Sequence, residues 1–539
     1  MSLLGLFDIG KSAMLASQTA LSTTGHNIAN AQTPGFNRQD VILESATPVT
    51  GIGGLIGAGV TVSGITRDYN RFIQSQLISQ QQNLGRSDAM NQSFRPVEEV
   101  FNDEQETGLL NSLNDYFSAW NEVSANPEGL AERSLLLQKA NGLVTMTKRM
   151  EQTIEDDLGQ INESMDDSVN RINSLTKDIA QLNDKIIQIE AGQDGEKAND
   201  LRDQRDRFMN ELSNLIEINS YENSDGSITV TSGSGTFVSG VHAGTLSTRM
   251  NQDGNNDLYL NGINITSQIT KGQLGGLIDA RADIESGPLL GLRKLIASIT
   301  MEVNQLHTSG YDLDGTTGNN FFNPLQVSLN SSSQGATATA AITNPDQVTL
   351  DEYTITFDGS GNYSVRTKGS GALVSSGSYS SGNPITFEGL RVVITGTVTS
   401  NDAFTISPLT NAIENFGVAL TDPKKIAAAS SDTTIPGDNT KALAIAGLQQ
   451  SNITDLGDST FTDFYKGIVS TVGTMSREAS DNVNFDKNLL TEIENRQQSA
   501  SGVSLDEEAA NLIKFQRAFE AGAMMIKVTD ELLQTVLDL

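Results

Sequence analysis

Several short patterns in the sequence contain residue types that could do chemistry. The first, GLFDIGKS over residues 5–12, satisfies the G-x-x-x-x-G-K-[ST] spacing of phosphate-binding loops. That chemistry requires a buried strand before the loop, so that backbone N–H groups point at the phosphate. Only four residues precede Gly5, and an apolar repeat continues through the motif. We therefore expect a helix here. The alternative, a phosphate-loop NTPase, would show a nucleotide-dependent thermal shift that Lys11→Ala abolishes.

Two further patterns have plainer explanations. Gly457-Asp458-Ser459 has the letters of a hydrolase nucleophile motif, but no strand stands next to it, and we expect Ser459 to cap a helix. Asp312 and Asp314 lie in GYDLDG at the spacing of a calcium loop. The glycine comes one position early and no Glu closes the ring, so the segment predicts a turn.

The segment NDLRDQRD, residues 199–206, interleaves Asp with Arg and could form a polar site. Because residues four apart share one face of a helix, we expect these charges to pair along the helix instead. The chain has no cysteine, which removes disulfides, thiolate metal ligands and cysteine nucleophiles. From these patterns we expect no enzyme, no catalytic or metal-binding residue and no cofactor.

Charge and hydropathy narrow the possible partners. The formal net charge of −31 argues against nucleic acid, which requires a basic surface. No apolar run approaches about 18 residues, so we expect no membrane insertion. The opening MSLLGLFDIGKS has no basic segment before an apolar block. We therefore expect either a protein that stays inside the cell or one exported without a cleaved signal peptide.

The elements that organise the chain are its two ends. The last stretch, residues 505–539, carries an apolar residue every seven positions, which predicts a helix with a seam for another helix. Ser504 and Glu507 form a capping box at its start. Residues 3–29 repeat the pattern, with Gly10 and Ser17 small enough for close approach of another backbone. The seam positions are Phe7, Met14, Leu21, Ile28, Leu505, Leu512, Phe519, Ile526 and Leu533.

Matching seams at both ends predict that the terminal helices pack on each other and that a remaining exposed face joins neighbouring copies. We therefore interpret the nine seam positions as an assembly interface. The alternative is a terminal helix docked on the core of its own chain. If the seam serves assembly, Phe519→Ala or Leu512→Asp weakens assembly while the isolated monomer keeps its melting temperature.

The middle of the chain alternates between helical and β patterns. Residues 69–218 are mostly helical, with a strong heptad register over residues 158–189. A second heptad series, residues 461–479, is the expected partner of the first. Residues 221–270 and 326–407 alternate polar and apolar residues and predict β-structure, separated by a helix over residues 274–308 that Gly287-Pro288 interrupts.

Within the second β-region, two strand pairs are expected. Tyr353, Ile355 and Phe357 alternate into an Asp358-Gly359 turn, from which Tyr363 and Val365 return. The runs Leu390–Ile394 and Phe404–Ile406 suggest another pair.

Together these patterns predict a multidomain α plus β fold. Terminal heptad helices and a coiled-coil-rich helical domain come from both chain halves, and all-β domains are inserted in the middle. The expected domains are a terminal helical domain of residues 1–35 and 503–539, a helical domain of residues 36–219 and 411–502, a mixed β/helix domain of residues 220–325 and an all-β domain of residues 326–410.

The helix exit GHNIANAQTPGFNRQ carries a family resemblance. Asn27 and Asn30, then Thr33-Pro34-Gly35 and Arg38-Gln39, resemble the N-terminal signature of bacterial flagellar rod, hook and hook-associated proteins. Residues 53–70, the NDLRDQRD segment and the C-terminal SGVSLDEEAANLIKFQRAFEAGA also match this family. The combination of both ends with this length is most similar to the members that join hook to filament.

The resemblance implies a structural function in the flagellum. Terminal helices would line the tube, central domains would project outward, and subunits would form the layer that connects hook to filament. Implied partners are copies of itself, the hook protein, the next hook-associated junction protein and a cytoplasmic export chaperone. The implied location is extracellular, after type III export. Another axial protein, from hook or distal rod, and a secreted β-domain adhesin remain as alternatives.

Overall fold

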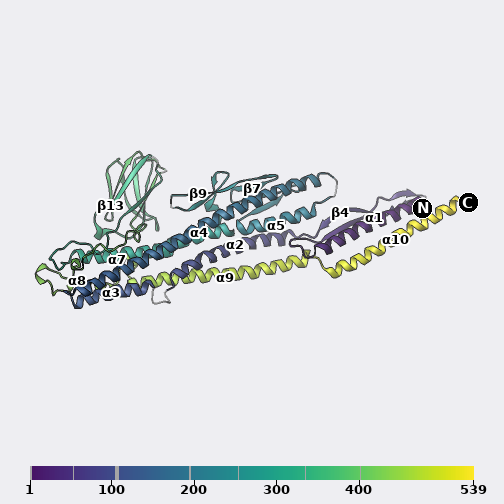
Figure 1. Ribbon diagram of the computed structural model, residues 1–539. Coiled ribbons are helices and arrows are strands. Elements are labelled where there is room, and N and C mark those ends of the chain that lie inside the picture. Colours follow the sequence, from purple (N-terminus) through teal and green to yellow (C-terminus); the bar gives the residue numbers. More distant parts are fainter. Residues whose placement is uncertain are drawn as a thin grey trace.

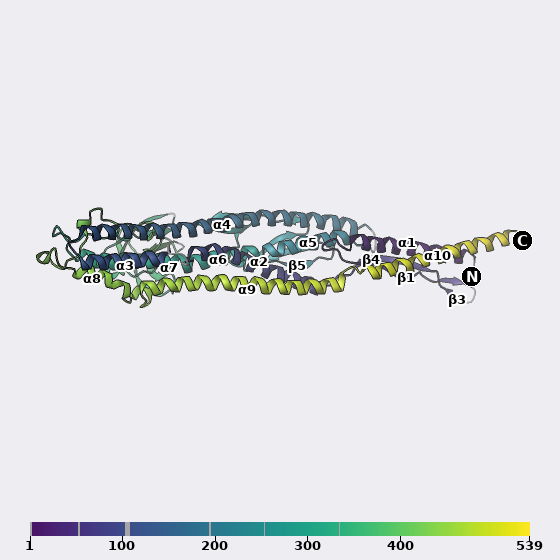
Figure 2. The ribbon, with the colours of Figure 1, turned by 60° about the horizontal axis from the view of Figure 1, so that its bottom comes forward.

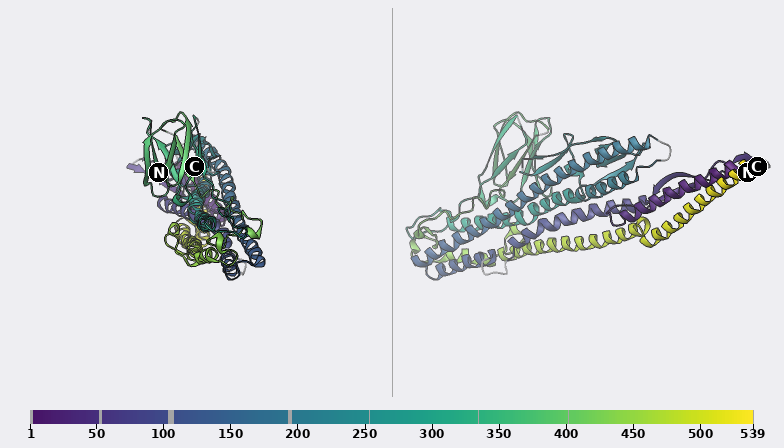
Figure 3. Two further views of the ribbon diagram at one scale, coloured as in Figure 1. Left: turned by 90° about the vertical axis from the view of Figure 1, so that its left-hand side faces the viewer. Right: turned by 45° about the vertical axis from the view of Figure 1, so that its right-hand side comes forward.

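The computed structural model describes residues 3–51, 54–102, 108–192, 196–252, 254–333, 335–400 and 402–538. The molecule is elongated, and its two ends lie together at one tip (Figure 1, Figure 2). From this tip a narrow arm leads into a long helical body, and a β domain stands on the far part of the body (Figure 3). The predicted fold class, with terminal helices and central β-structure, is confirmed.

The arm consists of two antiparallel helices and a long β-hairpin. Its elements are α1 (Leu3–Asn30), β1 (Gln39–Ser45), β2 (Val49–Gly51), β3 (Gly54–Ile56), β4 (Val60–Arg67) and α10 (Leu505–Leu537). α1 packs along α10 on one side and against strands β1 and β4 on another. The predicted pairing of the two terminal helices is therefore confirmed. A two-stranded sheet is marginal in water by itself, so α1 supplies the apolar surface that the hairpin needs.

The body is built from long helices of both chain halves. They are α2 (Arg71–Val100), α3 (Leu109–Ala125), α4 (Leu130–Glu190), α5 (Asn199–Leu215) and α9 (Phe461–Ser501). α9 runs antiparallel to α2, and the side chains of Gln80 and Ser87 both donate to the Asp486 carboxylate. The expected pairing of the 461–479 series with the heptads of α4 is wrong, because α9 lies along α2. A heptad shows that a helix has a seam but does not specify its partner.

The apolar face of α4 is covered by α5 and by two small sheets. The strands are β5 (Asn219–Glu222), β6 (Ile228–Ser232), β7 (Gly235–Ser239), β8 (His242–Ala243), β9 (Leu246–Met250), β10 (Asn256–Leu260) and β11 (Ile263–Asn264). Asn183 of α4 bonds both backbone groups of Ile228, and Asn173 bonds both of Leu246. Each Asn thus takes the place of a neighbouring strand. The β-structure predicted for residues 221–270 is confirmed.

Further helices connect the sheets to α9. They are α6 (Gly272–Ile284), a π-helical turn (Glu285–Leu289), α7 (Leu290–Thr308) and α8 (Thr440–Gly447). The predicted interruption at Gly287-Pro288 is confirmed as the π-turn, since proline cannot donate the helical hydrogen bond. Short 3-10 turns lie at Thr266–Gln268, Pro345–Gln347, Pro423–Lys425, Asp432–Thr434, Leu448–Gln450 and Thr454–Leu456.

The inserted β domain holds two sheets over a shared apolar core. The strands are β12 (Ser328–Ser331), β13 (Ala336–Ile342), β14 (Tyr353–Phe357), β15 (Asn362–Thr367), β16 (Leu373–Ser378), β17 (Pro384–Phe387), β18 (Leu390–Gly396) and β19 (Ala403–Ser407), in the orders β12-β19-β14-β15-β16 and β13-β18-β17. The predicted β14–β15 hairpin is confirmed, with Phe357 opposite Tyr363. The suggested pairing of β18 with β19 is wrong, because the two strands belong to different sheets.

Candidate assembly site

The two helices of the arm touch at glycines. A Cβ atom added at Gly10 would lie 3.2 Å from the carbonyl oxygen of Gly522 and 3.0 Å from Cγ1 of Ile526. A Cβ atom added at Gly522 would lie 3.2 Å from the carbonyl oxygen of Gly10. The backbones can approach this closely because neither residue has a side chain. The expectation that Gly10 allows close approach is confirmed.

Small and polar residues, not the large apolar ones, form the buried face of α1. Its buried positions are Gly10, Ala16, Ser17, Ala20, Thr23, Thr24 and Asn27. Met14 and Leu21 are half-buried, whereas Phe7 and Ile28 are exposed. The large side chains therefore lie beside the helix contact. On α10, Leu512, Phe519, Ile526 and Leu533 are half-buried, and Leu505 is exposed. The heptads identified the packed helices but not the residues that close the contact.

α10 has a second apolar face, which the sequence reading missed. It is formed by Ala518, Ala521, Met525, Val528, Leu532 and Val536, which follow one another at intervals of three and four residues. Val528 is 48% exposed and Leu532 is 44% exposed. The Cβ atom of Met525 would lie 3.3 Å from a Cβ atom at Gly10, so this face borders the contact with α1. The sequence signal for this face is a second apolar repeat along α10, offset from the first.

The signature residues lie where the arm meets the body. Asn27 is buried; its side-chain amide donates to the Gln39 carbonyl, and its side-chain oxygen accepts from the Gln39 N–H. The Asn30 amide donates to the His26 carbonyl, and the Asn30 oxygen accepts from the Thr33 hydroxyl. Gly35 has φ +78°, a backbone conformation that is unfavourable for residues with a side chain. Asn27 and Asn30 thus stabilise the helix exit.

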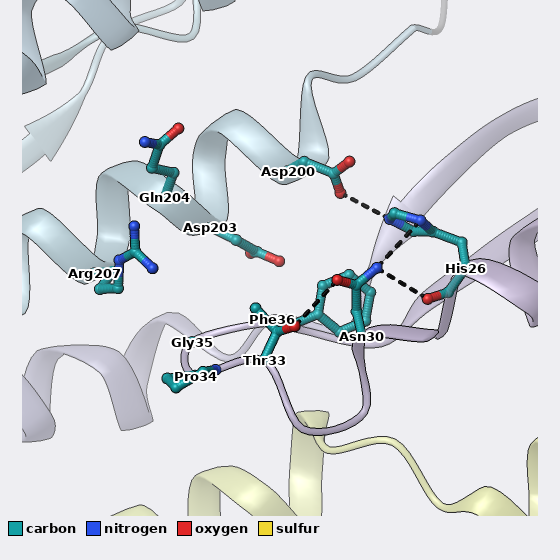
Figure 4. A pocket seen from close by; sticks show the side chains of 10 residues that line it. All are labelled: His26, Asn30, Thr33, Pro34, Gly35, Phe36, Asp200, Asp203, Gln204 and Arg207. Carbon is teal, nitrogen blue, oxygen red and sulfur yellow. Dashed lines mark hydrogen bonds and ion pairs between the residues drawn. The ribbon is translucent and has the colours of Figure 1, made fainter. Parts of the chain in front are cut away.

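An exposed cleft opens between this turn and α5 (Figure 4). Thr33, Pro34, Gly35 and Phe36 form one wall, and residues of α5 form the other. His26 closes one end, with Nε2 3.2 Å from the Asp200 carboxylate. Because the walls come from the arm and the body, the cleft marks the boundary between them.

Three consecutive residues after the turn contact four helices. We call Asn37-Arg38-Gln39 the junction segment. The N–H and side-chain amide of Asn37 donate to Asp203 of α5, and the Arg38 N–H donates to the Ser501 carbonyl of α9. The Arg38 guanidinium donates to Glu508 of α10 at 2.8 Å. Gln39 bonds Asn27 of α1 as described above. The segment thus ties both chain ends to the body.

The charges of α5 pair with other elements and not with each other. Arg67 of β4 lies 2.5 Å from Asp203 and 2.7 Å from Asp206, with all three side chains largely buried. Arg202 bonds the carboxylates of Glu190 and Glu222. The expected pairing along the helix is wrong, because these charges pair with residues of β4, α4 and β5. Because these side chains of α5 are buried, their charges are tolerated only when they pair with opposite charges on neighbouring elements.

The pKa values of these carboxyls reflect burial and pairing. Burial raises the pKa of Asp206, although Arg67 opposes this. Burial tends to raise the pKa of Glu190. Hydrogen bonds from Arg202 and from the Ala198 N–H outweigh this effect and lower the pKa to about 2. Both carboxyls are therefore held by cations from other elements.

The patterns that suggested other chemistry lie in ordinary structure. Residues 5–12 are part of α1, and Lys11 is exposed. The phosphate-loop geometry is absent there, as the sequence context predicted. Ser459 does not cap α9: its backbone bridges to Ile453, and the Thr460 hydroxyl accepts from the Asp463 N–H. The cap lies one residue later than expected.

The turn predicted for the Asp312 region is confirmed. The Asp312 carboxylate accepts from the backbone N–H groups of Asp314 and Thr316. The Lys425 ammonium lies 3.3 Å from the Asp312 carboxylate and 2.9 Å from that of Asp314. Among the residues that the structure describes, no group of three or more His, Asp or Glu side chains is placed to hold a metal ion. None of the described helices is long and apolar enough to cross a membrane.

Comparisons with known proteins agree with this architecture. Residues 94–322 match the flagellar hook-associated protein FlgK helical domain, and residues 326–408 match the D2-like domain of flagellar hook-associated protein 1. Flagellar hook-associated protein 1 of Escherichia coli (strain K12) is 30% identical, over 99% of each chain. The chain belongs to the flagellar hook-associated protein 1 family. The resemblance seen in the sequence is therefore confirmed, and the chain is a structural protein of the flagellar hook–filament junction.

Other members of the hook-associated protein 1 family extend this result. The protein of Bacillus subtilis (strain 168) is 26% identical over 98% of this chain and 97% of its own. The solved flagellar hook junction protein FlgK from Burkholderia pseudomallei shares the fold, with a TM-score of 0.70 at 20% identity, and covers 79% of this chain and 100% of its own. Both ends of the chain match models of rod proteins. Residues 7–37 match the flagella basal body rod protein, and residues 496–539 match the C-terminal region of the flagellar basal body rod FlgEFG proteins. The two terminal helices of the arm, α1 and α10, thus lie in the parts that match rod proteins.

Proposed function

We propose that copies of this chain form the layer between hook and filament by packing the second face of α10 against the arm of the next copy. The observation that carries this proposal is that α10 has two apolar faces and α1 covers only one. Met525, Val528, Leu532 and Val536 remain exposed over successive helical turns. A continuous apolar stripe of this kind is typical of an interaction surface.

The contact between copies is heterologous in this proposal. In the proposed packing, the second face of one copy lies against a part of the neighbour's arm other than the neighbour's own second face. Heterologous contacts generate rings or helical layers, whereas a self-complementary contact would stop at a dimer. Such a layer can end against the hook protein on one side and the next hook-associated junction protein on the other. Phe7 and Ile28, exposed on α1, extend the proposed interface.

The remaining parts of the chain keep the assignments expected from the sequence. We propose the division into a terminal helical domain, a helical domain, a mixed β/helix domain and an all-β domain at the boundaries given above. We also propose export through the type III apparatus without a cleaved signal peptide, assisted by a cytoplasmic chaperone. No catalytic role is included, since the exposed Lys11 lies in a helix without a phosphate cradle.

Paired substitutions test the function. Val528→Asp and Leu532→Asp place a charge on the second face, and Ile263→Asp places the same charge on an exposed apolar position of β11. Each variant is expressed in place of the parent protein. We expect all three proteins to melt like the parent and to be secreted. Only the two arm variants should be missing from isolated hooks by immunoelectron microscopy. Normal incorporation of Val528→Asp would contradict the proposal.

A further inference from the structure

A short linker joins α9 to α10, and Arg38 forms hydrogen bonds with residues on both sides of it. α9 ends at Ser501 and α10 begins at Leu505, with Gly502, Val503 and Ser504 between them. The Arg38 N–H donates to the Ser501 carbonyl at 2.9 Å, at the last residue of α9. The guanidinium of the same residue donates to Glu508 at 2.8 Å and lies 3.8 Å from Glu507, in the first turn of α10. Arg38 therefore holds both sides of the linker.

The two layers of the arm are attached to the body very differently. The hairpin and the junction segment bond α5 through Asn37, Gln39 and Arg67, and Asn199 of α5 donates to the Ile65 carbonyl of β4. His26 of α1 reaches Asp200 of α5. In the described part of the chain, the polar contacts of α10 with other elements are those of Glu507 and Glu508 with Arg38 and Asn27. Among the described residues, none of these contacts joins α10 directly to the body.

The burial of Glu508 makes its contact with Arg38 important for the position of α10. Its side chain is 1% exposed, and a buried carboxylate is tolerated only with a cation or several hydrogen bonds. Arg38 supplies the cation, and the Asn27 amide adds a hydrogen bond at 3.2 Å. Without the guanidinium, the buried carboxylate must take up a proton or regain water, and to regain water the first turn of α10 must move away from Asn27.

We propose that Arg38 is a positioning residue that fixes the direction of α10 relative to α9, and with it the orientation in which the second face of α10 is presented to the next copy. The proposal rests on the proposed function only for its consequence in assembly. The link itself is a property of one chain. α1 and the hairpin keep their place through α5, whereas α10 is held by its packing along α1 and, at its first turn, by the Arg38–Glu508 pair.

The absence of cysteine makes the proposal measurable in the full chain. One pair of spin labels, at Asn488→Cys on α9 and Gln516→Cys on α10, reports the direction of α10. A second pair, at Lys185→Cys on α4 and Gln18→Cys on α1, reports the rest of the arm. All four positions are exposed, so the labels do not enter a core. Pulsed electron paramagnetic resonance gives the distance distribution for each pair.

We expect both pairs to give one narrow distribution in the otherwise unchanged chain. Arg38→Ala should broaden the α9–α10 distribution and leave the α4–α1 distribution unchanged. Arg38→Lys should broaden it less, because the ammonium keeps the charge but loses the planar fork of donors. Glu507→Gln is the matched control, because Glu507 is exposed and lies farther from Arg38 than Glu508 does.

The exchange Arg38→Glu with Glu508→Arg should narrow the distribution only in part, because the new carboxylate would lie beside those of Asp40 and Asp68, which are 3.6 and 3.8 Å from Arg38. An unchanged α9–α10 distribution in Arg38→Ala would overturn the proposal. So would broadening of both pairs together, which would show a general loss of structure. Normal assembly of Arg38→Ala despite a broadened α9–α10 distribution would instead count against the proposed function and leave the role of Arg38 within one chain intact.

Discussion

Gly10 and Gly522 face each other across the arm, each with its carbonyl oxygen 3.2 Å from where a Cβ atom of the other would lie. Val at either position would therefore push the helices apart. We predict that Gly10→Val destabilises the arm. Backbone amides of α1 and α10 should then lose protection in hydrogen exchange. Gly25→Ala is the control, because no atom lies within 4 Å of its added Cβ and alanine favours helix by about 1 kcal/mol. Equal protection in both variants would show that the close approach is unimportant.

Phe519 of α10 is half-buried, so it contributes to the arm of the single molecule as well as to assembly. Removing a large buried side chain typically costs about 2 to 5 kcal/mol, and half-burial places Phe519→Ala near the lower end. We predict faster proteolysis of α10 in the monomer of this variant. Val528→Ala is the control, since an exposed side chain changes stability little. This refines the sequence expectation, in which the monomer was unaffected. An unchanged rate of cleavage in Phe519→Ala would restore the original expectation.

Arg67 neutralises two buried carboxylates, those of Asp203 and Asp206. Arg67→Met keeps much of the volume but leaves both charges without their cation. Breaking a buried pair in this way costs about 3 to 5 kcal/mol. Denaturant unfolding should show this loss. Arg171→Met, which removes an exposed ion pair with Glu211, should cost about 1 kcal/mol or less. Similar losses for the two variants would mean that the α5 cluster is not held by charge.

His307 is buried and uses both ring nitrogens. Nδ1 donates to the Asn319 carbonyl, and Nε2 accepts from the Ala427 N–H. Burial lowers the pKa of His307 from 6.5 to about 4, so the unfolded chain binds a proton that the folded chain does not. Stability from this residue is therefore complete above about pH 6.5 and is lost as the pH falls toward 4. The predicted loss is about 3 kcal/mol over this range. His307→Gln should have a flatter stability profile there. An equally steep profile would assign the loss to carboxyl groups.

The local features of the fold could be predicted from the sequence. Ser504 begins α10 because its hydroxyl and the acidic first turn act within a few residues. Pro288 interrupts α6 and α7 for a similarly local reason. The turn at Asp312 also follows from residues next to each other in the chain. Such features depend on neighbours that the sequence itself displays.

Features that depend on distant partners were harder to predict. The heptads of α9 fit α4 as well as α2, and only the three-dimensional packing selects α2. The charges of α5 could have paired with each other, but Arg67 and Glu190 approach from other elements. The contact in the arm uses small residues because glycines permit a shorter distance than Phe7 or Met14 would allow. The second face of α10 was missed because the side of α10 that stays exposed depends on where α1 packs, which the sequence does not display.

We propose that the second face of α10 contacts another copy of the chain in the flagellum. A photoreactive amino acid at Val528 in assembled flagella tests this most directly, with the same group at Ile263 as control. We predict that mass spectrometry finds Val528 joined to arm peptides of a second copy, distinguished by isotope labelling of mixed subunits, and that Ile263 gives no such product. Products confined to α1 or α10 of the same chain would contradict the account.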